Sequence, residues 1–229
     1  HKSTTLHKNL VKSDKEDWIL TDGVLGQTFK SSPVGKLKSD NISNDLLKVS
    51  NDFNKGVKLS PFENSGVYLD GQFYTIKTTP KYDGKVVNLG DILEPLENIP
   101  QEFYITEDTL EKWEYLKGAK NEQRFNKAQG YHYRYNEGSM IFPDPLNKPS
   151  RTIITGEGGK SASRFKHVVN QNGTLRRLTP IELERLNMFP DNHTLLEGIT
   201  DAKRAFFMGN ALVVGVVEKI GKTLAKVTD

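Results

Sequence analysis

The absence of cysteine is the feature that most constrains the fold of this chain. None of its 229 residues is a cysteine, so neither disulfides nor thiolate-bound metals can hold it together. The five histidines are scattered along the sequence, and we expect no metal site. The fold must therefore rest on a hydrophobic core, and the length suits one large domain or two small ones.

No segment has the composition of a membrane span or a leader. The longest unbroken apolar run is Ala211 to Val214, far shorter than a span needs, and the first twenty residues are polar and charged. We therefore expect a cytoplasmic protein. The chain begins with His rather than Met, and for this reason we expect it to be a fragment or a processed piece.

Charge is distributed unevenly behind a net value of +3. Residues 61–120 carry a net charge of −5, whereas residues 121–180 carry +6 and hold six of the eight arginines. Guanidinium groups suit bidentate contacts with phosphate or guanine. The pattern indicates an anionic partner for this stretch, with a plain solvated surface as the open alternative.

Local patterns predict an α+β chain. Alternation and turn residues favour a hairpin over 67–76 with a turn at Asp70-Gly71, and strands over 131–135, 151–155 and 164–169. Helices are expected over 106–116, after Thr179 in a capping box with Glu182, and over 210–227. Residues 156–161 imitate a phosphate-binding loop, but Ile154 stands where such a loop needs glycine, so a plain glycine loop is the better interpretation.

Three segments in the C-terminal third match known blocks in order and spacing. Residues 176–191 closely resemble the ninth conserved block of cytosine-5 DNA methyltransferases, with Arg176, Leu178, Pro180, Arg185-Leu186 and Phe189-Pro190-Asp191 in place. Residues 208–214 resemble the tenth block, and residues 149–154 with Gly158-Gly159 resemble the end of the target-recognition domain. The chain is similar to the C-terminal half of a bacterial restriction–modification enzyme of this family.

The resemblance implies an architecture. A polar variable region over 1–60 would precede a mostly β target-recognition domain over 61–175. Helices within 176–229 would then complete a Rossmann-like methyltransferase domain. The apolar residues of the final helix, including Val216 and Val217, would need a partner from the missing half, or the fragment would self-associate.

The resemblance also implies a reaction. Family members flip a cytosine out of duplex DNA, add a Cys thiolate to its ring and methylate it with S-adenosylmethionine. Because this chain holds no cysteine, we expect no catalytic residue in it and no activity from it alone. It would be a truncated enzyme or one subunit of a split enzyme, and a non-catalytic DNA-binding module is the rival interpretation.

Site residues follow from the same resemblance and from charge. Thr152 is expected to contact a DNA phosphate, and Arg134, Arg164 and Lys166 are further candidates for DNA binding. By resemblance, Gly209, Asn210 and Ala211 face the cofactor. The arginines at 176, 177 and 185 are expected to be structural.

Overall fold

The computed structural model describes residues 14–42, 45–52 and 62–228. The chain divides into two compact units, one formed by residues 1–84 with 216–229 and the other by residues 85–215. These boundaries differ from the predicted segments 1–60, 61–175 and 176–229, whose functional meaning stays a prediction. The first twenty residues are predicted to hold no leader, and of these, residues 1–13 lie outside the described residues. Among the helices that are described, none is both long and apolar enough to cross a membrane.

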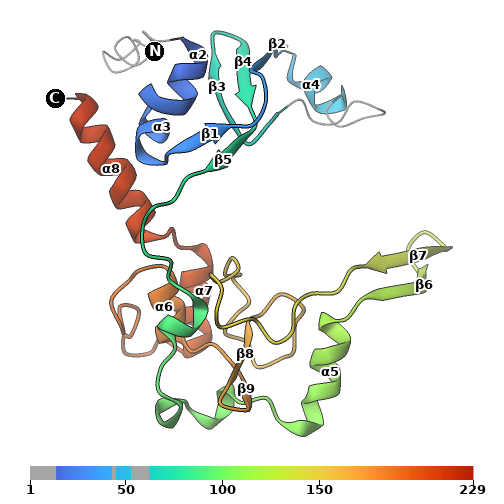
Figure 1. Cartoon of the computed structure of the whole chain (residues 1–229). Helices are drawn as coiled ribbons and strands as arrows, with labels where there is room; N and C mark the ends of the chain where they lie inside the picture. Colours follow the sequence, from blue (N-terminus) through green and yellow to red (C-terminus); the bar gives the residue numbers. More distant parts are fainter. Residues whose placement is uncertain (1–13, 43–44, 53–61, 229) are drawn as a thin grey trace. The chain divides into compact units, whose positions relative to one another are not determined.

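The first unit is built on small antiparallel sheets. One sheet has the order β2-β4-β3, and β1 pairs with β5 (Figure 1). The predicted hairpin over 67–76 is confirmed, because Asp70 and Gly71 both adopt positive φ and close a two-residue turn between β3 and β4. The described elements are α2 (Lys15–Asp17), the π-helical turn η1 (Trp18–Asp22), α3 (Val24–Thr28), β1 (Ser31–Pro33), β2 (Lys38–Asn41), α4 (Leu46–Asp52), β3 (Ser65–Leu69), β4 (Gln72–Ile76) and β5 (Thr78–Pro80).

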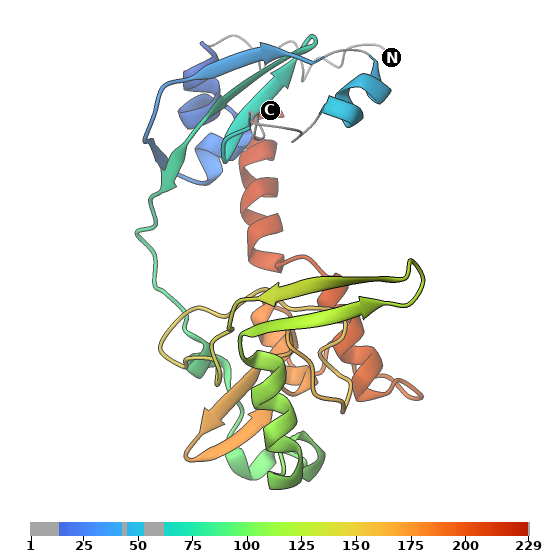
Figure 2. The same cartoon turned by 90° about the vertical axis from the view of Figure 1, so that its right-hand side faces the viewer.

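The second unit combines two hairpins with helices. Its hairpins are β6–β7 and β8–β9, and the β6–β7 ribbon extends away from α6 and α7 (Figure 1). Three 3-10 turns, η2 (Leu89–Ile92), η3 (Leu96–Asn98) and η4 (Gln101–Phe103), precede the longer elements. These are α5 (Glu107–Lys117), β6 (Lys120–Asn126), β7 (Tyr131–Glu137), β8 (Val168–Gln171), β9 (Thr174–Arg177), α6 (Pro180–Leu186) and α7 (Asp201–Asn210) (Figure 2). The last helix, α8 (Val214–Thr228), begins at the end of this unit.

The hydrophobic core lies in the second unit, where η2, β8, α6 and α7 meet. Its buried members are Leu89, Ile92, Val169, Leu178, Leu183, Ala205 and Met208. The predicted helix over 106–116 is confirmed as α5, with Trp113 buried and Gly118 as its C-cap. The core thus joins the segment before β6 to the C-terminal helices.

Two predicted strands were wrong in whole or in part. Residues 151–155 form no strand, and of the segment 164–169 only Val168 and Val169 belong to one. The reason is that backbone carbonyls here accept from side chains instead of from a neighbouring strand. The carbonyl of Phe165 accepts from Arg151, and that of Lys166 accepts from both Arg151 and Lys117.

The predicted helix over 210–227 was placed too early. An unpredicted helix, α7, ends at Asn210, the next three residues are irregular, and α8 begins at Val214. The start of α8 is tied to the end of α6, because the Val214 amide donates to the Asn187 carbonyl over 2.9 Å. Val216 and Val217 expose 43% and 48% of their surface. That a partner or a second copy covers them stays a prediction.

A fully buried ion pair anchors α6. Glu182 forms the predicted capping box with Thr179, and its carboxylate accepts from Nη1 and Nη2 of Arg176 over 2.8 and 2.7 Å. The same carboxylate accepts the backbone amides of Glu94 and Thr179, each over 2.9 Å. Both charged side chains have zero exposure. Such a pair is tolerated in a core only because every polar atom has a partner.

Substituting one member of this pair should destabilise the fold strongly. Glu182→Gln leaves the Arg176 guanidinium buried without its counter-charge, so we expect the free energy of unfolding to fall by about 3–5 kcal/mol. Chemical denaturation of the chain measures it. Glu197→Gln, at an exposed carboxylate, is the control and should change stability by less than about 0.5 kcal/mol. Equal stability of both variants would contradict the prediction.

Candidate functional site

One cavity in the second unit collects residues from distant parts of the sequence. It has a volume of about 610 Å³ and includes Thr152, Gly209 and Ala211 in its lining. The other lining residues are Val87, Ile92, Ser150, Arg151, Ile153, Arg185, Leu186, Asn187, Met188, Met208 and Val213. The structure therefore brings a predicted DNA-contacting residue and two predicted cofactor-facing residues to one cavity. Asn210 does not line it, and its amide donates to the Phe206 carbonyl.

An ion pair holds the segment that carries Thr152. The Arg151 guanidinium donates to both oxygens of Asp144, with Nε–Oδ1 at 2.5 Å and Nη2–Oδ2 at 3.1 Å. Burial raises the pKa of Asp144, but Arg151 and the Val168 amide outweigh it, so this pKa lies below its usual value. The side chain of Thr152 is exposed, and its hydroxyl makes no hydrogen bond within the described residues. A fixed backbone thus presents a free hydroxyl.

A buried histidine joins this segment to the glycine loop. The His167 ring places Nδ1 2.9 Å from Glu157 Oε1 and Nε2 3.1 Å from Ser150 Oγ. The other Glu157 oxygen accepts the His167 backbone amide over 3.0 Å. The imidazole is fully buried. It therefore fixes the distance between residue 150 and the loop at 156–161.

Two glycines allow this loop to lie directly on α7. A Cβ on Gly209 would come within 2.5 Å of the Thr155 backbone, and one on Gly158 would come within 2.6 Å of Ala202 Cα. Real Cβ atoms do not approach so closely, so only glycine is compatible with this packing. By resemblance, Gly209 is expected to face the cofactor. In the structure, what approaches its Cα is the backbone of Thr155.

Two of the predicted DNA-binding residues have their donors occupied inside the protein. Arg164 donates to the carbonyls of Leu116, Gly118 and Gly138 and pairs with Glu137 at 3.0 Å. Lys166 is buried and donates to the carbonyls of Gly159 and Ser161. The strand alternation that placed them on an open face does not exist there. These two residues therefore hold loops together, and the structure does not support a DNA contact by either.

The remaining arginines divide into structural and exposed groups. The expectation of structural roles is confirmed: Arg176 pairs with Glu182, Arg177 donates to Gly159 and Glu102 carbonyls, and Arg185 pairs with Asp191 and donates to Ile92. By contrast, Arg134 lies exposed on β7, and its Nε donates to Asn121 Oδ1 over 2.6 Å. It is the one predicted DNA-binding arginine that remains accessible.

Sequence reasoning missed the residues that position the site. No sequence motif singles out Asp144, Glu157 or His167. Their hydrogen-bond partners lie 7 to 24 residues away in the sequence, and much of the intervening chain is irregular. A weak signal was available, since acids are scarce in the basic stretch 121–180. In the structure, Glu122, Glu137 and Asp144 each pair with a Lys or Arg, and Glu157 is bonded to the His167 ring. Among the described residues, no cluster of His, Asp and Glu could hold a metal ion.

Stability should depend on the charge of Asp144. Its pKa is lowered by folding, so its contribution is complete above the unfolded value near 3.8 and is lost as the pH falls through the folded value. Asp144→Asn should cost about 2 kcal/mol at pH 7, because the hydrogen bonds to a charged partner are lost. Denaturant unfolding at pH 7, 5 and 3 should show this difference shrinking only below about pH 4.

The matched control for this experiment is Glu111→Gln, at an exposed position of α5. It should leave the curve near that of the unmodified chain at every pH. A difference for Asp144→Asn that is as large at pH 3 as at pH 7 would show that the carboxylate charge is not the stabilising feature.

Comparison with known proteins gives a consistent assignment. A model of the C-5 cytosine-specific DNA methylase family matches residues 34–226. The type II methyltransferase M.Sau3AI of Staphylococcus aureus is 37% identical over 223 residues, which is 96% of this chain and 51% of that protein. The chain therefore spans about half the length of this curated relative.

Two solved structures also resemble the chain. The Entamoeba histolytica methyltransferase EhMeth is 14% identical with a TM-score of 0.44, over 90% of this chain and 56% of that one. The S. pombe Dnmt2 methyltransferase is 16% identical with a TM-score of 0.45, over 85% and 59%. The family match covers most of the chain, and a relative at 37% identity agrees with it. The chain belongs to the C-5 cytosine-specific DNA methylase family.

Proposed function

We propose that this chain is the DNA-recognition and C-terminal part of an S-adenosylmethionine-dependent DNA (cytosine-5)-methyltransferase from a restriction–modification system. The whole enzyme would flip a cytosine out of a specific duplex site and methylate it. The observation that carries the proposal is the cavity where Thr152 meets Gly209 and Ala211 in a chain of this family. Its 37% identity to a type II methyltransferase supports the restriction–modification context.

The exposed hydroxyl of Thr152 would bind a backbone phosphate near the target. Its segment is fixed by the Arg151–Asp144 pair, so the hydroxyl is already in place before DNA arrives. A phosphate contact positions the duplex and carries no sequence information. In this role Thr152 would set the register in which the cytosine leaves the stack, a step that costs a few kcal/mol of unstacking.

The lining of the cavity fits only an edge of the cofactor. S-adenosylmethionine carries a sulfonium, an amino group and ribose hydroxyls, for which carboxylates are suitable partners, and a carboxylate, for which a free cation is suitable. Among the described residues, no Asp or Glu lines this cavity, and the cations that do, Arg151 and Arg185, are paired with Asp144 and Asp191. The backbone at Gly209 and Ala211 can supply one wall, with Asn210 beside it. This chain matches about half of its curated relative. We propose that the groups that hold the cofactor lie in the other half of the enzyme.

The methyl-transfer step needs that other part as well. Family chemistry uses a thiolate that adds to the cytosine ring, and this chain contains no cysteine. We propose as its partner an N-terminal catalytic segment, on the same polypeptide or on a separate subunit. The rival proposal is a non-catalytic DNA-binding module, which also has no need of a cysteine. The two proposals differ in whether adding an N-terminal catalytic segment restores methyl transfer.

The purified chain should transfer no methyl group to DNA, and a separately produced N-terminal segment of M.Sau3AI-type sequence should restore transfer. Incorporation of labelled methyl groups into duplex DNA is the measurement. The N-terminal segment with its catalytic Cys changed to Ser is the control and should give no signal. Methyl transfer by the chain alone would contradict the proposal, and DNA binding without any restored activity would favour the non-catalytic module.

Binding to duplex DNA should fall steeply with salt, because phosphate contacts release counterions. Lys127→Ala, in the exposed turn between β6 and β7, should flatten the slope of log K against log salt by about 1. Thr152→Val removes an uncharged contact, so affinity should drop roughly two- to tenfold with the slope unchanged. Fluorescence anisotropy across 50–300 mM salt measures both.

Lys112→Ala, at an exposed position in the acidic stretch on α5, is the control and should change neither affinity nor slope. Arg164→Ala and Lys166→Ala should instead lower the thermal midpoint, because their donors are engaged with backbone carbonyls. An affinity for duplex DNA that does not depend on salt would refute the proposed phosphate binding.

A further inference from the structure

The two faces of the β6–β7 ribbon differ in chemistry. The strands pair antiparallel from Lys120↔Glu137 to Asn126↔Tyr131, so residues directly opposite each other share a face. One face, here called the paired face, carries Lys120, Glu122, Arg124, Asn126, Tyr131, Tyr133, Tyr135 and Glu137. The other, here called the amide face, carries Asn121, Gln123, Phe125, His132, Arg134 and Asn136.

The charged groups of the paired face are engaged within the protein. Lys120 pairs with Glu137 at 2.9 Å, and Arg124 pairs with Glu122 at 3.1 Å. The Arg124 guanidinium also lies 3.6 Å from the centre of the Tyr135 ring. The charged groups of this face and the Tyr135 ring therefore stabilise the ribbon itself.

The amide face is open along its whole length. All six of its side chains are exposed, and none of them is a carboxylate. Within the described residues, the amides of Gln123 and Asn136 make no hydrogen bond. The His132 ring contacts the Phe125 ring, with centroids 4.8 Å apart. A row of unsatisfied donors and acceptors with no negative charge is suited to a polar ligand that is anionic as a whole.

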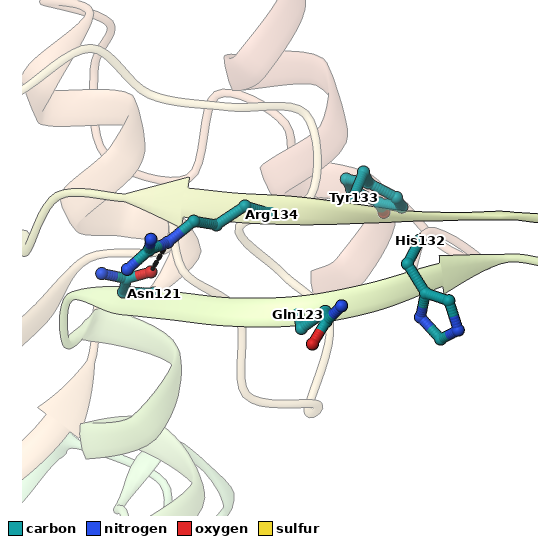
Figure 3. A pocket seen from close by; sticks show the side chains of 5 residues that line it. All are labelled: Asn121, Gln123, His132, Tyr133 and Arg134. Atoms are coloured by element: carbon teal, nitrogen blue, oxygen red, sulfur yellow. Dashed lines mark hydrogen bonds between the residues drawn. The ribbon is translucent and has the colours of Figure 1, made fainter.

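Arg134 is already oriented on this face. Its Nε donates to Asn121 over 2.6 Å, which directs the guanidinium along the ribbon and leaves both terminal nitrogens without a partner in the described residues (Figure 3). Gln123 and His132 lie on the same side of the ribbon as this pair, and Tyr133 lies on the other (Figure 3). An arginine held in this way keeps its bidentate fork free.

This set of side chains matches the edges of DNA bases. Arginine pairs bidentately with guanine O6 and N7, and Asn or Gln pairs bidentately with adenine N6 and N7. The major groove of B-DNA is about 12 Å wide and admits a two-stranded β-ribbon. The seven-residue strands of β6 and β7 reach roughly 20 Å from the body of the unit, enough to follow the groove past several base pairs.

We infer that the amide face of the β6–β7 ribbon enters the major groove and determines the DNA sequence that this enzyme recognises. Arg134, pre-oriented by Asn121, reads a guanine. Gln123 and Asn136 read neighbouring bases, and Lys127 at the turn contacts a phosphate. The inference rests on the proposed function, because it assigns the specificity of the same DNA-binding surface.

The test separates sequence reading from general DNA affinity. The chain is incubated with duplex DNA carrying a randomised centre, and bound duplexes are sequenced. Arg134→Lys keeps the charge but removes the bidentate fork, so the salt slope should stay the same while discrimination at one base pair falls roughly ten- to a hundredfold. Gln123→Ala and Asn136→Ala should each relax a different base pair by a similar factor.

Controls address the fold and the face. The side-chain amides of Gln123 and Asn136 make no hydrogen bond in the described residues, so the two Ala variants should keep the thermal midpoint of the unmodified chain, and Arg134→Lys provides a conservative second route. Tyr131→Phe, on the paired face, should select the same sequence as the unmodified chain. An RNA duplex of the selected sequence should bind more weakly, because the A-form major groove is too narrow for side chains.

Three results would overturn the inference. If the three amide-face variants select the same site with undiminished discrimination, the ribbon does not read DNA, and the proposed function still stands. Equal affinity for the RNA duplex would exclude major-groove reading. If the unmodified chain binds no duplex DNA in a salt-dependent way, the inference and the proposed DNA-recognition function fall together.

Discussion

The buried pair of Arg176 and Glu182 is the interaction on which the rest of the second unit depends. One carboxylate caps α6, accepts the backbone of residue 94 and neutralises an arginine at the end of β9. It therefore joins a hairpin, a helix and a segment about 88 residues away. Charges buried this completely are costly unless each donor and acceptor has a partner, and that requirement allows a single arrangement of these elements. The cavity wall formed by the end of α6 is fixed as a consequence.

Backbone packing places the end of α7 and the segment that carries Thr152 at one cavity. Gly158 and Gly209 let the glycine loop lie against α7, and the pair of Asp144 with Arg151 holds the segment that follows. Thr152, which resembles a phosphate contact, thus lines the same cavity as Gly209 and Ala211, which resemble a cofactor turn. This arrangement explains why glycine stands at positions 158 and 209, where a side chain would separate the loop from the helix.

The cations of the second unit fall into two groups: buried ones that support the fold and exposed ones on the surface. Buried arginines and lysines donate to backbone carbonyls and carboxylates, because irregular segments need donors that strands and helices would otherwise supply. Exposed cations occur at several places on the unit, and on the ribbon Arg134 lies beside the side-chain amides of Asn121 and Gln123. The net charge over residues 121–180 therefore overstates the number of cationic groups that are free to bind an anionic partner. The family assignment concerns the chain as a whole, whereas its specificity would lie in a few ribbon side chains.

Sequence by itself determined the local features whose partners are neighbours in the chain. These are the hairpin turn at Asp70-Gly71, the capping box at Thr179, the helix before Gly118, and the ordered blocks over 149–221 that identified the family. Only the tertiary structure decided which charged residues are free. Arg134, Arg164 and Lys166 look alike in sequence, yet contacts between distant segments bury Lys166, engage Arg164 and leave Arg134 exposed. The physical reason is that the alternation of residue types along a segment predicts which face a side chain lies on only when the segment forms a strand. Around Phe165 and Lys166 no strand forms, because side chains from elsewhere in the fold donate to the backbone carbonyls that a neighbouring strand would otherwise bond.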